Sequence, residues 1–144
     1  MSKIIDFTTK ENDFLFRLIG RVAIDMNAPA YVVGGFVRNF FLKRQSKDID
    51  IVCVGNGIQL AENVAALLQP SPKVVTYSRY GTAMFRFNDI EFEFVGARKE
   101  SYSADSRKPS VEEGTLEDDQ KRRDFTMNAL AFSLNPDEFG LFLD

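Results

Sequence analysis

Two aspartates placed two positions apart, Asp48 and Asp50, are the residues of this chain best suited to metal chemistry. They open an apolar run over residues 51–54 that predicts a buried strand, and alternate strand residues point to the same face, about 6.5–7 Å apart. Carboxylates so placed can bind one divalent ion together or bridge a pair of ions about 3.5–4 Å apart. A charge at the edge of a buried segment is costly unless it is paired or metal-bound. The spacing therefore predicts a metal site.

A third carboxylate for this site is available on another predicted strand, residues 90–97. Glu91 and Glu93 share one face of that strand, and alternation alone does not choose between them. The chain has no histidine and a single cysteine, Cys53, in an apolar run. These absences exclude histidine general bases and histidine or multi-cysteine zinc sites. Carboxylate oxygens favour hard cations such as Mg²⁺ or Mn²⁺.

The glycine pair Gly34-Gly35 stands between a predicted strand and a predicted short helix. Glycine permits positive φ and a close approach of backbone to ligand, and a helix N-terminus attracts phosphate. Arg38 follows one turn later, and its planar guanidinium can reach a phosphate oxygen. The segment therefore predicts a place to hold a nucleoside triphosphate. No Lys-Ser/Thr follows the glycines, which argues against a P-loop phosphotransferase.

The elements that must position these residues follow from periodicity and turn signals. Apolar spacing predicts a helix over residues 10–26, and Thr8 with Glu11 forms a candidate capping box before it. Asn88-Asp89 predicts a tight hairpin turn, whereas residues 101–115 predict a long loop. The pattern indicates an α+β fold, a mixed sheet packed against helices. Strands are predicted at 30–33, 48–54, 73–77, 82–87, 90–97 and 129–134, with further helices at 36–42, 58–68 and 117–123.

Composition limits the class of protein. At 144 residues, with 44% apolar and 27% charged residues, the chain fits one globular domain with its own core. No apolar stretch approaches the ~20 residues that span a bilayer, so we expect a cytoplasmic protein. A net charge of −3 argues against a free-standing nucleic-acid binder. Basic residues are nevertheless clustered where they could meet phosphates: Arg98, Lys99, Arg107, Lys108, Lys121, Arg122 and Arg123.

Three separated motifs together resemble the head domain of bacterial tRNA nucleotidyltransferases and poly(A) polymerases, class II members of the polymerase-β-like nucleotidyltransferase superfamily. The motifs are Gly34-Gly35-Phe36-Val37-Arg38, Asp48-Ile49-Asp50 and Arg122-Arg123-Asp124-Phe125-Thr126-Met127-Asn128-Ala129-Leu130-Ala131. The resemblance covers nearly the whole chain. It implies a mixed, largely antiparallel sheet of about five strands with flanking helices. It also implies that Asp48 and Asp50 bind metal.

The same resemblance assigns further residues. The third acidic residue of the family lies five positions before an arginine, a spacing that Glu93 and Arg98 share. Glu93 is therefore the expected third catalytic and metal-binding residue. The polar stretch 101–115 matches a family loop that helps to switch between nucleotides. The residues expected to grip the ribose and triphosphate are Asp119, Arg122, Arg123, Asp124 and Asn128.

One position departs from the family. An aspartate usually follows the motif arginine, whereas this chain has Asn39 after Arg38. The change removes a negative charge and weakens any ion pair with a neighbouring arginine, although a hydrogen bond can survive. It affects fine positioning more than the metal site.

The implied activity is template-independent addition of nucleotides, CCA in particular, to the 3′ end of tRNA. ATP and CTP would be the substrates, two Mg²⁺ ions (or Mn²⁺) the cofactors, and tRNA or another RNA 3′ end the partner, with no DNA or membrane. Residues 1–144 would form the head, cut before the neck, body and tail. The alternatives are a poly(A) polymerase, an enzyme that adds only CC or only A, and a non-catalytic NTP- or RNA-binding head.

Overall fold

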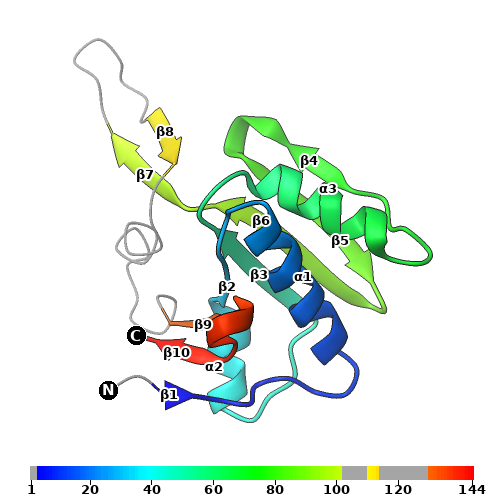
Figure 1. The fold of residues 1–144 in the computed structure, drawn as a ribbon, viewed down its shortest axis with the longest axis vertical. Coiled ribbons are helices and arrows are strands. Elements are labelled where there is room, and N and C mark those ends of the chain that lie inside the picture. Colours follow the sequence, from blue (N-terminus) through cyan, green and yellow to red (C-terminus); the bar gives the residue numbers. More distant parts are fainter. Residues whose placement is uncertain (1–2, 102–109, 114–129) are drawn as a thin grey trace.

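The computed structural model describes residues 3–101, 110–113 and 130–144. Its main sheet has eight strands in the order β1-β10-β9-β2-β3-β6-β5-β4 (Figure 1). Neighbouring strands are antiparallel except for β3 and β6, which are parallel. The strands are β1 (Lys3–Ile4), β2 (Ala30–Val33), β3 (Asp48–Cys53), β4 (Val75–Tyr77), β5 (Thr82–Phe87), β6 (Ile90–Gly96), β9 (Ala131–Ser133) and β10 (Leu141–Leu143).

The predicted α+β class with a mixed, largely antiparallel sheet is confirmed, but the expected number of strands is too small. Two of the additional strands, β1 and β10, come from the two ends of the described chain and pair with each other. They have two and three residues. Such short strands show no alternation that a sequence pattern could reveal.

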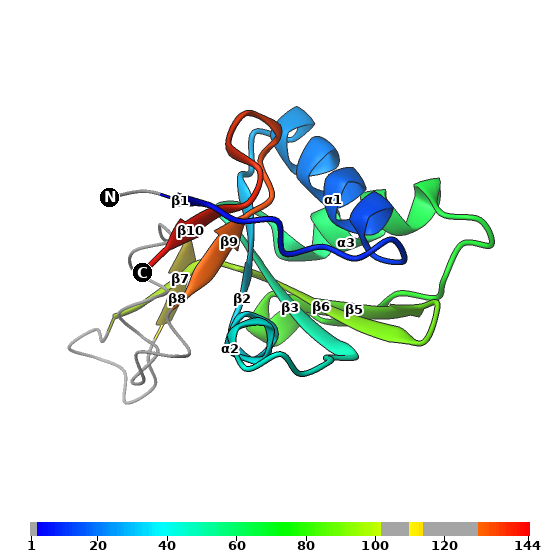
Figure 2. The ribbon, with the colours of Figure 1, turned by 90° about the horizontal axis from the view of Figure 1, so that it is seen from below.

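Three described α-helices flank the sheet: α1 (Asp13–Asp25), α2 (Gly35–Phe41) and α3 (Gly57–Leu67). Helices α1 and α3 lie side by side on one face (Figure 2). The helices predicted at residues 10–26, 36–42 and 58–68 are present. The predicted capping box of Thr8 and Glu11 is wrong. Asn12 is the N-cap of α1 and makes no side-chain capping bond, while the Thr8 hydroxyl donates to the Asp13 carboxylate at 2.8 Å.

The face of the sheet beneath α1 and α3 is apolar. Ile51 on β3 and Phe94 on β6 are fully buried there, together with Phe16 of α1. The N-terminal segment is fixed to the same core, because the Phe7 ring stacks on that of Phe132 with centroids 4.6 Å apart. Since strand residues alternate between faces, the residues between these apolar positions must point to the opposite face.

The hairpin between β5 and β6 fixes the register of the central strands. Asn88 and Asp89 both have positive φ, 52° and 63°. This is the type I′ geometry whose twist suits a two-residue hairpin, so the predicted turn is confirmed. Further along, β7 (Arg98–Ser101) pairs with β8 (Ser110–Glu113) as a separate two-stranded sheet that projects from the main one (Figure 1).

The β7–β8 pair corrects part of the predicted loop over residues 101–115, which is strand at 101 and at 110–113. A two-stranded sheet outside the core needs no apolar alternation, so the polar sequence gave no strand signal. The remainder of that loop and the predicted helix at 117–123 lie outside the described residues.

Asn135 ties the start of β2 to the end of β9. It is 2% exposed, and its side-chain oxygen accepts a hydrogen bond from the Ala30 N–H at 2.9 Å. Its amide nitrogen donates to the Ser133 hydroxyl at 3.0 Å. Replacement of Asn135 by alanine leaves the buried Ala30 N–H without that acceptor, a loss that typically costs about 1–3 kcal/mol.

We therefore expect Asn135→Ala to lower the free energy of unfolding by about 1–3 kcal/mol in urea denaturation. The exposed Gln59→Ala, on α3, serves as the control and should change it by less than about 0.5 kcal/mol. Equal small effects of the two substitutions would show that Asn135 does not hold the strands together.

Candidate active site

The parallel pairing of β3 with β6 places carboxylates beside one another. Asp50 is the register partner of Glu93, and Asp48 is the partner of Glu91. All four point away from the core, because the alternate residues, such as Ile49, are buried beneath the helices. Adjacent strands are about 4.8 Å apart. The sheet therefore gathers four acidic side chains on one face, here called the carboxylate face.

The two glutamates have different cross-strand neighbours on β5. Its Arg86 lies opposite Glu91, whereas Met84 lies opposite Glu93. Cross-strand partners of opposite charge stabilise each other, so the charge of Glu91 can be balanced within the sheet. Glu93 has an apolar neighbour at the equivalent position and lies beside Asp50. Its position beside Asp50 favours Glu93 as the third carboxylate, and its catalytic role remains a prediction.

A small apolar cluster follows the carboxylates on the same face. Asp50 is partly buried and stands at the border between this cluster and the exposed acidic positions. Charges interact more strongly where neighbouring groups exclude water. The cluster comprises Val33, Val52, Val95 and Ala131, with Tyr31 and Leu143 packed against it. Burial, reinforced by the negative charge of Glu138, raises the pKa of the Tyr31 phenol, so the Tyr31 side chain stays neutral at physiological pH.

These oxygen donors suit Mg²⁺ or Mn²⁺, which prefer carboxylates. Among the described residues, however, no three His, Cys, Asp or Glu side chains are gathered closely enough to hold a metal ion. Mg²⁺ is commonly held by one or two carboxylates together with substrate phosphates. The pair formed by Asp50 and Glu93 fits this arrangement, in which the phosphates complete the coordination.

The glycine pair lies directly beside these carboxylates. Val33, the last residue of β2, is the register partner of Asp50, and Gly34 follows it. Gly34 has φ 72° and ψ −135°, a conformation essentially restricted to glycine. A Cβ at Gly35 would meet only the Arg38 guanidinium, at 3.7 Å, among the described atoms within 4 Å. Packing within the described protein therefore does not require glycine at position 35.

Arg38 and Asn39 follow on α2. Arg38 is exposed and free to extend toward an anion near the glycines. The Asn39 amide donates to the Ser46 hydroxyl at 2.7 Å and so joins α2 to the segment that leads into β3. Asn39 therefore makes a hydrogen bond that links the helix after Gly34-Gly35 to the chain just before Asp48.

The family model for the poly A polymerase head domain matches residues 30–143. The chain belongs to this family. The A-adding tRNA nucleotidyltransferase of Geobacter sulfurreducens is 37% identical over 131 residues, which cover 90% of the chain and 15% of that protein. Nucleotidyltransferases of this kind generally use divalent metal ions.

Solved structures of tRNA nucleotidyltransferases have the same fold as this chain. A CCA-adding enzyme in apo form II superimposes with a TM-score of 0.86 and 35% identity, covering 100% of the chain and 35% of that structure. A tRNA nucleotidyltransferase complexed with a primer tRNA and an incoming ATP analog superimposes with a TM-score of 0.75 and is 35% identical. The match covers 88% of the chain and 34% of that structure. The head thus spans about a third or less of the proteins it matches. None of its described helices is long and apolar enough to cross a membrane.

Not every predicted site residue of the head can be placed. The structure brings Gly34, Gly35, Asp48, Asp50 and Glu93 together around the end of β2 and along β3 and β6. The residues expected to bind ribose and triphosphate lie outside the described residues, and their roles stay predictions: Asp119, Arg122, Arg123, Asp124 and Asn128.

Sequence reasoning missed a group of residues beside Glu93. Tyr77, Tyr80 and Thr82 line an open cavity of about 350 Å³ together with Glu93. The available signal was a pair of tyrosines in a short polar segment, but only the pairing of β4 with β5 brings them to the carboxylate face.

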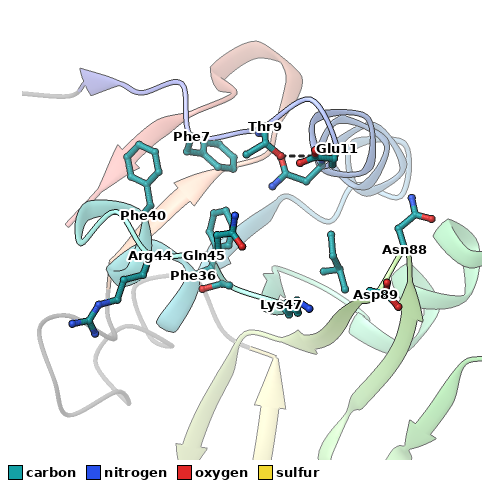
Figure 3. Close-up of a pocket in the computed structure, with 13 residues that line it drawn as sticks. Phe7, Thr9, Glu11, Phe36, Phe40, Arg44, Gln45, Lys47, Asn88 and Asp89 are labelled. Carbon is teal, nitrogen blue, oxygen red and sulfur yellow. Dashed lines mark hydrogen bonds between the residues drawn. The ribbon is translucent and has the colours of Figure 1, made fainter.

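A second, more enclosed cavity of about 310 Å³ lies apart from these residues. Figure 3 shows Phe7, Phe36 and Phe40 on one side and Asn88 and Asp89, from the β5–β6 turn, on the other. None of the predicted metal- or phosphate-binding residues lines it. The open carboxylate face, rather than this cavity, therefore holds the predicted site residues that the structure describes.

The conformation of Gly35 gives a test of phosphate binding that separates function from stability. Because alanine is the better helix residue and has space here, Gly35→Ala should leave the melting temperature unchanged or higher. The added methyl group should block close approach of phosphate and weaken ATP affinity about tenfold in calorimetry with Mg²⁺.

Two variants control this experiment. Gly34→Ala should lower both stability and affinity because alanine does not tolerate the backbone angles at that position. Glu62→Ala, on the exposed surface of α3, should change neither. Unchanged ATP affinity in Gly35→Ala would remove the glycine pair from the nucleotide site.

Proposed function

We propose that the protein containing this head is a tRNA nucleotidyltransferase, which joins a nucleotide to the 3′ end of tRNA and releases pyrophosphate. The observation that carries the proposal is the placement of Asp50 beside Glu93 on parallel strands, next to Gly34-Gly35. Matched structures of CCA-adding enzymes include complexes with ATP and with CTP. These complexes support ATP and CTP as the substrates here.

Each part of the site has a task in this reaction. The backbone at Gly34-Gly35 receives the triphosphate, and Arg38 offsets its negative charge. Asp48, Asp50 and Glu93 would hold two Mg²⁺ ions, or Mn²⁺. Bound there, the ions supply positive charge that lowers the pKa of the RNA hydroxyl and stabilises the departing pyrophosphate.

The protein contributes mainly position and charge, as in phosphoryl transfer generally. A bond forms between the RNA 3′ oxygen and the α-phosphorus, while the bond from the α-phosphorus to the bridging oxygen of pyrophosphate breaks. No side-chain nucleophile is required. Asp119, Arg122, Arg123, Asp124 and Asn128 would hold the ribose and the triphosphate in line with the attacking oxygen.

The roles proposed here for the described residues are toward phosphate and metal, and every nucleoside triphosphate carries the same phosphates and binds the same ions. The part of the chain that the structure describes therefore does not distinguish among addition of CCA, CC and A. Addition of the terminal A alone is the second candidate. It is favoured by similarity to A-adding enzymes, including one from Aquifex aeolicus that is 38% identical over 115 residues. A cytoplasmic location also remains a prediction.

Substitutions on β3 and β6 test the catalytic assignment. In the intact protein, Asp50→Asn and Glu93→Gln should each reduce nucleotide addition about 100-fold or more, since loss of even an outer-shell partner of a metal costs 10–100-fold. Addition would be measured with Mg²⁺ on a tRNA that lacks CCA and on one that lacks only the A.

Glu91→Gln is the matched control because Glu91 lies on the same strand and face, opposite Arg86. It should keep activity within a few-fold of the unchanged protein. Full activity of Glu93→Gln together with loss in Glu91→Gln would assign the third carboxylate to Glu91. Normal activity of Asp50→Asn would end the metal hypothesis.

A further inference from the structure

The open cavity beside Glu93 has two aromatic walls. Tyr77 and Tyr80 line it with Thr82, and the tyrosines are 49% and 54% exposed. Neither ring belongs to the buried apolar clusters of the described residues. Their exposed faces next to a predicted catalytic carboxylate suit a ligand with a flat, aromatic surface.

The turn between β4 and β5 fixes the position of these rings. It contains a short 3₁₀ segment, η1 (Ser78–Tyr80), followed by Gly81 with φ 65°. The Gly81 N–H donates to the Ser78 carbonyl at 3.2 Å, and the Thr82 hydroxyl donates to the Tyr80 carbonyl at 3.3 Å. A surface that is already ordered loses less conformational entropy when it binds a ligand.

A positive charge accompanies the tyrosines. The guanidinium carbon of Arg79 lies 5.8 Å from the centroid of the Tyr80 ring. Proteins that bind single-stranded nucleic acid combine aromatic rings, on which bases stack, with basic groups that contact the backbone phosphates. The segment Tyr77-Ser78-Arg79-Tyr80 supplies both on a short stretch of chain.

The order of the strands separates this segment from the nucleotide phosphates. The strands run β2-β3-β6-β5-β4, so Gly34-Gly35 lies on one side of the carboxylates and Tyr77 on the other. Two strand spacings, about 10 Å, separate β6 from β4. A nucleotide transfer brings two substrates to the carboxylates, and the tyrosines occupy the side away from the triphosphate.

We propose that Tyr77 and Tyr80 stack the terminal base of the RNA that receives the nucleotide and so hold its 3′ hydroxyl beside Glu93. This inference rests on the proposed nucleotidyltransferase function. Stacking accepts any base, because every base presents a π face. The same pair of rings could therefore receive the growing end after each addition.

Steady-state kinetics of the intact protein give the first test. Tyr77→Ala and Tyr80→Ala should each raise the KM for tRNA about tenfold, the usual effect of losing one base-stacking ring. The KM for ATP and CTP should not change. Tyr77→Phe and Tyr80→Phe keep the ring and should behave like the unchanged protein. Phe14→Ala is the control, since Phe14 is exposed, at 63%, on α1 over the opposite face. A rise in the KM for nucleotide alone, or no change, would refute the inference.

A binding experiment separates this inference from the proposed function. A short RNA with 2-aminopurine at its 3′ end is added to the intact Asp50→Asn protein with Mg²⁺. Stacking should change the fluorescence of the 2-aminopurine. The change should be abolished when Tyr77→Ala and Tyr80→Ala are combined with Asp50→Asn in the same protein. If the unchanged protein extends no RNA but this tyrosine-dependent signal is present, the activity is refuted and the stacking site stands. If the unchanged protein extends RNA but the fluorescence change is the same with and without the tyrosine substitutions, the stacking site is refuted and the nucleotidyltransferase activity stands.

Discussion

The parallel pairing of β3 with β6 is the contact on which the site depends. It is the one parallel pair in the described sheet, and its register places Asp50 beside Glu93 and Asp48 beside Glu91. Parallel strands need a crossover connection, which here runs through α3, β4 and β5. Because a shift of one residue would turn every carboxylate into the core, the buried Ile51 and Phe94 hold the acidic residues on the outer face.

One face of the sheet carries the hydrophobic core, and the opposite face carries the acidic residues. The face under α1 and α3 is packed with phenylalanine and aliphatic side chains, which fixes the positions of the strands. The other face changes along β3 and β6 from an apolar cluster to exposed carboxylates. A divalent cation that carries phosphate can be held by one or two such carboxylates. Such a face is better suited to binding charged substrates than to adding stability.

The sequence predicted the central elements because their signals are local. The strand predicted from the apolar run at residues 51–54, the strand at 90–97, the Asn88-Asp89 turn and the strand before Gly34 all appear in the structure. Alternation could not choose between Glu91 and Glu93, because only the register of β6 on β3 shows that Glu93, and not Glu91, lies beside Asp50. The tyrosine cavity was missed for the same reason, because it exists only after β4 and β5 pair. Local spacing also predicted a capping box that Asn12 replaces.

The central claim is that Asp50 and Glu93 jointly bind a divalent ion beside the triphosphate. Anomalous diffraction from crystals of the protein grown with Mn²⁺ and a non-hydrolysable ATP analogue tests it most directly. We expect a manganese peak within about 2 Å of oxygens from both carboxylates and from a phosphate of the analogue. Manganese bound only at Glu91, or only to the phosphates with neither Asp50 nor Glu93 in contact, would contradict the claim.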